Sequence, residues 1–264
     1  MSADGRTMQH RDIERMAGSC GLKDHVVVIT GAAGGIGSAL VKRFDREGAR
    51  LALADFNEEG VSKLASELDA TGERVISVAY NATEPSDADR LVSKCISAFG
   101  HIDHLVPAAG IFESQAIANM TDEQWQRTMA INLDGLFYIC RRAIPFIADG
   151  GTIVTIASGA AHSGSPGHVH YSASKGGVLA FTKSLAKELA PKVRVNTVSP
   201  GTIDTKMIEE FMRENGASWI AKTPAGRVGT TDEVASAVLF LCSGASSYIF
   251  DQAIHVNGGS YIGG

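Results

Sequence analysis

Thr30-Gly31-Ala32-Ala33-Gly34-Gly35-Ile36-Gly37 stands between an apolar run at 25–30 and an amphipathic segment at 36–47. The preceding run is β-branched and suits a strand that is buried on both faces of a parallel sheet. Glycines let the backbone turn sharply, and a helix start offers unpaired N–H groups and the positive end of its dipole. The stretch therefore predicts a strand, a glycine turn and a helix able to bind a pyrophosphate.

The same alternation of strand and helix continues along the chain. Strands are expected at 25–30, 51–55, 74–79, 102–108, 152–157, 193–198 and 252–256. Helices are expected at 36–47, after the capping residue Asn57, at 85–99, at 121–147, from the segment carrying Tyr171 to 190, and at 230–241. This order predicts an α/β fold with a doubly wound, Rossmann-type parallel sheet of about seven strands and helices on both faces.

Two stretches need separate comment. The capping box Thr121-Asp122-Glu123-Gln124 opens a helix that we expect to reach Ile147, with Pro145 disturbing its last turn. Residues 201–229 show no regular pattern, and a long irregular stretch in a compact domain is often a functional loop. We therefore expect a substrate lid at about 201–229.

Size and composition limit the classes of protein. With 264 residues, 44% of them hydrophobic, the chain suits one globular domain, expected at 23–264 after a polar tail at 1–22. The tail lacks the apolar core of a signal peptide, although a short helix at 8–16 is possible, and no stretch has the length of a membrane span. A net charge of −5 without a basic stripe argues against nucleic acid as a partner.

The four cysteines are scattered through the chain. They are Cys20, Cys95, Cys140 and Cys242. No short spacing joins them, which argues against a zinc site and against a disulfide framework. Free thiols are typical of a reducing compartment, and the expected location is cytoplasmic.

Tyr171 and Lys175 are four residues apart on an expected helix and so lie on one of its faces. A free tyrosine has a pKa near 10, but a nearby ammonium group favours the phenolate. Tyr171 is therefore expected to act as a general acid and base. Ser158, just after an expected strand, would bind and orient the substrate oxygen.

The glycine pattern TGxxxGxG at 30–37, followed by Tyr171-x-x-x-Lys175, resembles the short-chain dehydrogenase/reductase family from about Asp24 to the C-terminus. The resemblance implies hydride transfer with a nicotinamide cofactor. It adds Asn132, expected to bind a water that links Lys175 to solvent, to the catalytic set. That set is Asn132, Ser158, Tyr171 and Lys175. The resemblance also implies a homotetramer that uses the tyrosine helix and the last strand.

Asp55, at the end of the second strand, indicates which cofactor is used. A carboxylate there accepts hydrogen bonds from the adenosine ribose and repels a 2′-phosphate, which favours NAD over NADP. The resemblance implies adenine contact for Asn81, where the family has an acidic residue, and nicotinamide carboxamide contacts for Ile203 and Thr205. The predicted cofactor-binding residues are Gly31, Ala33, Gly35, Ile36, Gly37, Asp55, Phe56, Asn81, Ala82, Ala109, Gly110, Tyr171, Lys175, Pro200, Gly201, Ile203 and Thr205.

Pro107 departs from the family pattern after the fourth strand. The family usually has Asn-Asn-Ala-Gly there, and this chain has Pro107-Ala108-Ala109-Gly110. Proline removes an N–H group and an amide side chain. We therefore expect weaker hydrogen bonding in the sheet at this point, with the chemistry unaffected.

The expected substrate is a secondary alcohol or ketone, with cyclic diols, polyols and sugars as open alternatives. Its predicted contacts are Ser158, Ala160, His162, His168 and Met207. The spacing of His162, His168 and His170 does not support a metal site. An NADP-linked 3-oxoacyl-type reductase stays as an alternative, although Asp55 opposes it. A non-catalytic NAD-binding regulator is a further alternative, which the presence of all the catalytic residues opposes.

Overall fold

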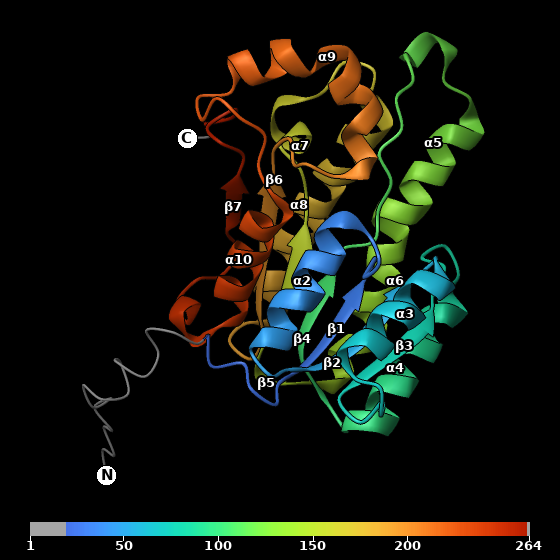
Figure 1. Cartoon of the computed structure of the whole chain (residues 1–264), viewed down its shortest axis with the longest axis vertical. Helices are drawn as coiled ribbons and strands as arrows, with labels where there is room; N and C mark the ends of the chain where they lie inside the picture. The colour runs from blue at the N-terminus through green and yellow to red at the C-terminus, as the bar shows by residue number, and fades with distance from the viewer. Residues whose placement is uncertain (1–19, 263–264) are drawn as a thin grey trace.

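The computed structural model describes residues 20–262, apart from four side chains at positions 210, 211, 214 and 215. Within that range, seven strands form one sheet in the order β3-β2-β1-β4-β5-β6-β7 (Figure 1). The strands are β1 (Val26–Thr30), β2 (Arg50–Asp55), β3 (Val75–Ala79), β4 (Ile102–Pro107), β5 (Ile147–Ile156), β6 (Arg194–Pro200) and β7 (Ala253–Val256). Every pairing is parallel, which confirms the predicted doubly wound sheet.

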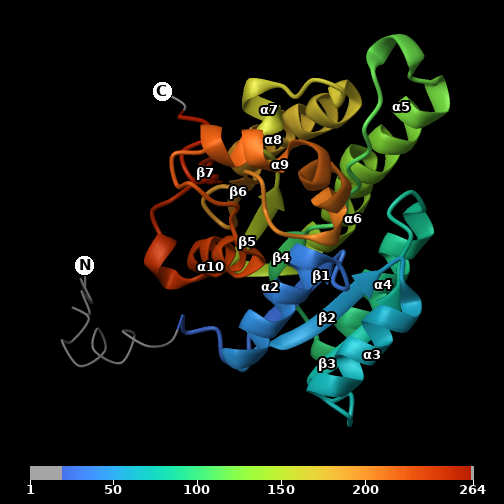
Figure 2. The same ribbon diagram turned by 45° about the horizontal axis from the view of Figure 1, so that its top comes forward.

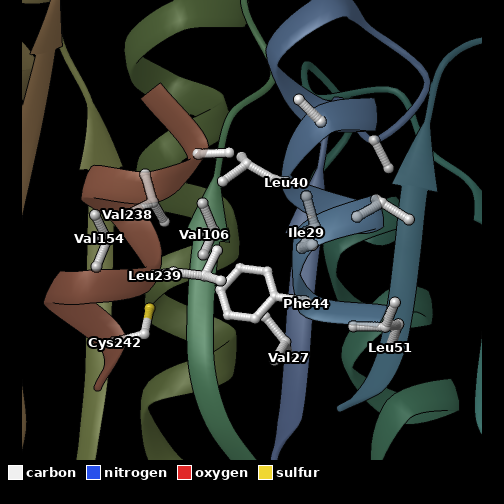
Figure 3. Close-up of a cluster of buried hydrophobic side chains, with 14 of the residues drawn as sticks. Val27, Ile29, Leu40, Phe44, Leu51, Val106, Val154, Val238, Leu239 and Cys242 are labelled. Atoms are coloured by element: carbon white, nitrogen blue, oxygen red, sulfur yellow. The ribbon is translucent and has the colours of Figure 1, made fainter. Parts of the chain in front are cut away.

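Helices cover both faces of this sheet (Figure 1). One face carries α2 (Gly35–Arg46), α3 (Glu58–Leu68) and α10 (Thr231–Cys242). The other face carries α4 (Pro85–Phe99), α6 (Gly135–Ala143) and α8 (Val169–Leu189). Figure 3 shows Phe44 of α2 beside Leu239 of α10, over Val27 of β1 and Val106 of β4. Phe44 is fully buried, and burial of such a side chain stabilises the fold by about 1.5–3 kcal/mol.

The registers of the strands set the position of the site. Thr30, the last residue of β1, pairs with Ala54 of β2 on one side and Pro107 of β4 on the other. The carboxyl ends of these strands therefore lie at one edge of the sheet. The strand order reverses between β1 and β4, and ligands of doubly wound folds bind in the crevice at such a point.

Pro107 has the local effect that its missing N–H predicts. On the β1 side the pairing continues beyond it, because Ala108 N donates to Thr30 O at 3.2 Å. On the β5 side the paired residues end at Leu105 and Ile153, two positions before the proline. The proline therefore shortens one ladder of hydrogen bonds and leaves the sheet order intact.

The predicted helix at 121–147 forms, with a π-helical turn inside it that the sequence did not indicate. The capping box at Thr121 forms as expected and opens α5 (Asp122–Met129), the π-helical turn follows at Ala130–Asp134, and α6 continues to Ala143. A short 3₁₀ turn, Ile144–Phe146, holds Pro145, and β5 already begins at Ile147. Proline cannot donate the next helical hydrogen bond, so the helix ends there and does not continue.

Residues 201–229 contain more regular structure than the sequence predicts. A 14-residue helix, α9 (Glu209–Lys222), follows a short 3₁₀ turn at Lys206–Ile208. It lies across the carboxyl ends of the strands at the top of Figure 1, and Figure 2 brings it forward beside the short α7 (Ala160–Ser163). Its apolar residues form no clean stripe and Gly216 lies inside it, so the pattern did not indicate a helix.

Most of the predicted tail, including the helix expected at 8–16, falls at positions 1–19 and lies outside the described residues. Between positions 20 and 262, none of the helices combines the length and the apolar character that crossing a bilayer requires.

Candidate active site

The glycine turn joins β1 to α2 at the carboxyl edge of the sheet. Gly31 has φ +69°, and a Cβ at this position would lie 2.8 Å from the backbone of Ala109. The Thr30 hydroxyl accepts a hydrogen bond of 3.3 Å from Ala109 N, so the turn packs closely on the loop after β4. The turn and the start of α2 thus offer a backbone surface that a phosphate group can approach.

Asp55 lies beside this turn at the end of β2. Its Oδ2 accepts a hydrogen bond of 2.9 Å from Ala33 N, and its Oδ1 accepts one of 2.8 Å from Asn57 N. These two bonds fix the carboxylate next to the place where an adenosine ribose would bind. Phe56, the next residue, has 80% of its surface exposed. A ring at this position is available to an adenine.

The predicted adenine contact Asn81 has its oxygen already bonded. Asn81 Oδ1 accepts hydrogen bonds from the backbone nitrogen and the hydroxyl of Thr83, at 3.1 and 2.9 Å. Ala82 lines a small cavity of about 10 Å³ under the site, together with Ala109, Asn132 and Lys175. A cavity of this size is about that of one water molecule.

A cleft of about 230 Å³ opens at the carboxyl edge and brings many of the predicted residues together. Those that line it are Ile36, Gly110, Ser158, Ala160, Tyr171, Lys175, Pro200, Gly201, Ile203, Thr205 and Met207. They come from five separate parts of the chain, and Trp219 of α9 lines the same cleft. The cleft therefore joins the expected cofactor contacts to the expected substrate contacts.

Tyr171 and Lys175 both face this cleft from α8. Burial raises the pKa of the Tyr171 phenol, and a hydrogen bond with Ser158 opposes that rise. Burial lowers the pKa of the Lys175 ammonium to about 8, because a charge is poorly solvated there. Lys175 Nζ donates to Ile156 O at 2.9 Å and lies 5.9 Å from the centre of the Tyr171 ring. The two side chains thus lie close enough for electrostatic coupling.

Asn132 lies in the π-helical turn and is 2% exposed. Its Oδ1 accepts from Ile111 N at 2.8 Å, and its Nδ2 donates to Ile111 O at 3.0 Å and to Ser174 Oγ at 3.1 Å. Ser174 Oγ in turn donates to Tyr171 O at 2.8 Å. The amide therefore connects the loop after β4 to the helix that carries Tyr171. This accounts for a buried polar residue in an apolar segment.

Two predicted substrate contacts do not line the cleft. The His162 ring bonds Ser199 Oγ at 3.1 Å and packs on His255 and on Tyr261, which itself lines the cleft. His168 stacks on Phe112 with ring centres 4.2 Å apart, so Phe112 separates it from the cleft. Burial lowers the pKa of both histidines. Spacing within a loop does not give the direction of a side chain, so the sequence could not show which of these rings would line the cleft.

Sequence reasoning missed part of the cleft wall. Tyr261 and Ser260 line it from the segment after β7, and Ile208, inside the lid expected at 201–229, lines it beside Met207. A signal for Tyr261 was present, because it follows the carboxyl end of a parallel strand, where ligand sites collect. Phe112 also lines the cleft and meets the Tyr171 ring edge to face, with centres 4.8 Å apart.

Comparison with known proteins agrees with this geometry. A family model described as enoyl-(acyl carrier protein) reductase matches residues 31–261. The crystal structure of a short-chain dehydrogenase/reductase from Brucella melitensis, titled glucose/ribitol dehydrogenase, has a TM-score of 0.91 and 42% identity to this chain, covering 93% of it and 100% of that chain. The chain belongs to the short-chain dehydrogenase/reductase family. As a member, it is an oxidoreductase that acts on CH–OH groups and uses a nicotinamide cofactor.

Curated members of the short-chain dehydrogenase/reductase family are similar over nearly their whole length. The 3-oxoacyl-(acyl-carrier-protein) reductase of Thermotoga maritima is 36% identical over 244 residues, covering 91% of this chain and 99% of that protein. The reductase of the same name from Escherichia coli strain K12 is 34% identical over 240 residues, covering 90% of this chain and 97% of that protein.

Proposed function

We propose that this protein transfers a hydride between NAD(H) and a secondary alcohol or ketone, with Tyr171 as the general acid and base. The observation that carries the proposal is the cleft in which Ser158, Tyr171 and Lys175 face the residues assigned to the nicotinamide. When bound, oxidised nicotinamide accepts the hydride of the carbinol carbon and brings a positive charge to the site.

Each side chain then has a separate task. Ser158 binds the substrate oxygen and orients it toward Tyr171. Tyr171 takes the hydroxyl proton during oxidation and returns it during reduction. Lys175 holds the nicotinamide ribose and favours the phenolate of Tyr171 by its charge. Asn132 holds Ile111 against α8 and so keeps the cleft wall in register with Tyr171.

The choice of NAD rests on Asp55. Its carboxylate is fixed by Ala33 N and Asn57 N beside the glycine turn, and this is where we propose that the adenosine ribose binds. A fixed negative charge there accepts hydrogen bonds from ribose hydroxyls and repels a 2′-phosphate. The cofactor set proposed for NAD is the one predicted from the sequence, from Gly31 in the turn to Thr205 before α9.

The second candidate is an NADP-linked 3-oxoacyl-type reductase. The names of the curated relatives favour it, and Asp55 opposes it for the reason just given. A non-catalytic NAD-binding regulator is opposed by the intact set of Ser158, Tyr171 and Lys175. The first two candidates differ in cofactor, so one assay separates them.

We propose a homotetramer as the assembly. Exposed apolar side chains on three helices support it: Phe137 of α6 and Val169 of α8 are each 42% exposed, and Phe240 of α10 is 39% exposed. Light scattering at micromolar concentration checks this, and a monomeric mass would refute it. A cytoplasmic location, suggested by four free cysteines, stays a prediction.

The test of the function is a spectrophotometric assay of the purified protein with NAD and NADP side by side. The panel contains secondary alcohols, polyols, sugars and cyclic diols, and 3-oxoacyl thioesters with NADH and NADPH in the reverse direction. We expect turnover that depends on NAD(H). If the protein turns over only 3-oxoacyl thioesters and only with NADPH, the NADP-linked 3-oxoacyl-type reductase replaces the NAD-dependent enzyme as the proposed function.

A further inference from the structure

The substrate side of the cleft is largely apolar. Its apolar wall is formed by Ile111, Phe112, Met207, Ile208, Trp219 and Tyr261. Met207 is 52% exposed and Trp219 is 38% exposed, so large apolar surfaces face water at the cleft. A ligand that covers these surfaces with hydrocarbon gains from their removal from water. The wall therefore favours a substrate whose body is apolar.

Charge selects against ionic substrates. Among the described residues that line the cleft, Lys175 alone carries a formal charge. Its Nζ already donates to Ile156 O, and its proposed partner is the nicotinamide ribose. A carboxylate or phosphate on the substrate would therefore find no cation of its own, and an ammonium would find no carboxylate. Burial of an unpaired charge is costly, so the cleft favours a neutral molecule.

Three serine hydroxyls of the wall are already bonded within the protein. Ser158 Oγ accepts from Ala160 N at 3.2 Å, the Ser163 hydroxyl bonds to the backbone oxygens of Gly159 and Gly164, and Ser165 Oγ bonds His168 Nδ1 at 3.1 Å. A sugar or polyol needs a partner for each hydroxyl that it buries, because an unpaired buried hydroxyl is unfavourable. On this side of the cleft, such a ligand would compete with bonds that the protein already makes.

The aromatic ring of Phe112 lies beside Tyr171 at the reacting end of the cleft. The Phe112 ring meets Tyr171 edge to face, at an interplanar angle of 84°, and His168 stacks behind it at 11°. Phe112 is thus held from two sides next to the group that transfers the proton. A flat or alicyclic ring that carries the reacting carbon can pack against the Phe112 ring.

We propose that the substrate is a neutral, ring-bearing secondary alcohol or its ketone, with one oxygen directed to Ser158 and Tyr171 and with hydrocarbon against Phe112, Met207 and Trp219. This inference rests on the proposed function. In oxidation the carbinol C–H bond breaks with its electron pair passing to NAD, the O–H proton passes to Tyr171, and the ketone and NADH are formed.

The experiment compares kcat/KM for cyclohexanol and 1-indanol with kcat/KM for ribitol and glucose, all with NAD. We expect the two ring alcohols to exceed the two polyhydroxylated compounds by at least about tenfold. An equal or higher value for ribitol or glucose overturns the inference. If Tyr171→Phe abolishes that polyol turnover, the proposed role of Tyr171 in hydride transfer is supported and only the proposed substrate class is wrong. The experiment therefore distinguishes failure of this inference from failure of the proposed function.

A binding measurement covers the case in which none of the four compounds turns over. The chain has two tryptophans, Trp125 and Trp219. Trp125→Phe leaves Trp219 as the fluorescent probe in the cleft wall. 1-Indanol is titrated into this variant saturated with NADH. The alcohol cannot react with the reduced cofactor, so the titration measures binding alone. Saturable quenching in the millimolar range supports the inference, and no saturable change with 1-indanol or cyclohexanol overturns it.

Met207 supplies the matched variants. Met207→Gln keeps the length of the side chain and adds an amide, and we expect it to raise KM for ring alcohols about tenfold with kcat nearly unchanged. Met207→Leu should restore a KM close to that of the original protein. Ile117→Gln, an equivalent change at a 62% exposed residue that does not line the cleft, should have no effect. An unchanged KM in Met207→Gln would count against the apolar wall.

Discussion

Asp55 Oδ2 accepts a hydrogen bond of 2.9 Å from the backbone nitrogen of Ala33, which joins the end of β2 to the glycine turn. The same carboxylate bonds Asn57 N through Oδ1. Its charge is therefore fixed by the backbone beside the glycine turn. In the proposed function, the same side chain selects the cofactor.

This relationship predicts the result of a change in cofactor preference. Asp55→Ala combined with Phe56→Arg removes a negative charge and adds a positive one, and the ratio of kcat/KM for NAD to that for NADP should fall about a hundredfold. Asp55→Asn is the control, since it keeps an acceptor for Ala33 and removes the charge alone. It should give an intermediate ratio. A ratio that stays unchanged in both variants would remove the role assigned to Asp55.

Asn132 is predicted to be structural as well as functional. Asn132→Ala leaves both backbone groups of Ile111 without their partner, and the free energy of unfolding should fall by about 2–4 kcal/mol. Urea unfolding measures that loss. Ser174→Ala removes one hydrogen bond of the same cluster and should cost only about 1 kcal/mol. Equal stability of Asn132→Ala and the original protein would contradict this account.

Gly110 lies where a methyl group would crowd Asn132, beside Lys175. A Cβ at this position would stand 3.2 Å from Asn132 Oδ1, which is tight, and 3.5 Å from Lys175 Nζ, which is ordinary contact. Gly110→Ala should therefore lower kcat/KM about tenfold or more by displacing the Asn132 amide next to Lys175. Gly176→Ala is the matched control, since a Cβ there has no neighbour within 4 Å and alanine favours the helix. Similar kinetics in the two variants would show that the space beside Lys175 is not critical.

The buried His104, which contacts His25, predicts how stability depends on pH. His104 bonds Thr152 Oγ1 at 2.8 Å and His25 Nδ1 at 2.9 Å. Burial lowers the pKa of His104 to about 3, and the neighbouring His25 contributes to this shift. Asp103 raises the pKa of His104 and Arg194 lowers it further, both to a smaller extent. The unfolded chain takes up a proton near pH 6.5 and the folded chain does not. The free energy of unfolding should therefore fall by about 1.4 kcal/mol per pH unit as the pH drops from about 6.5 toward 3.

His104→Gln isolates this contribution from that of other titrating groups. Urea unfolding of both proteins near pH 7 and near pH 5 gives the difference. The variant should lose less stability over this interval than the original protein, because its residue 104 does not titrate. If the two proteins lose the same amount, the pKa of His104 is not lowered in the fold.

Regular strands and helix starts could be predicted from the sequence because local signals determine them. The buried run Val26–Thr30 and the capping boxes at Thr121 and Thr230 formed as expected. The π-helical turn between α5 and α6 could not be predicted in this way. Asn132 bonds the backbone of Ile111 there, and a contact between such distant positions leaves no local pattern.

The same limit applies to the site. Tyr171 and Lys175 are four residues apart on one helix, so the sequence alone predicted that they lie on the same helix face. His162 and His168 lie in and after α7, where the direction of each ring depends on partners far along the chain: Ser199 for the first and Phe112 for the second. The apolar wall from α9 and Tyr261 needed the three-dimensional structure, because its members come from distant segments.

Turnover by Tyr171→Phe tests the central claim most directly. The variant removes one oxygen atom and keeps the ring that Phe112 contacts. Absorbance of NADH is followed with the best alcohol of the panel, and NADH binding is measured by fluorescence in the same preparation. The account predicts NADH binding within about twofold of the original protein and a loss of kcat of at least about a hundredfold. Turnover by the variant at the original rate would contradict it.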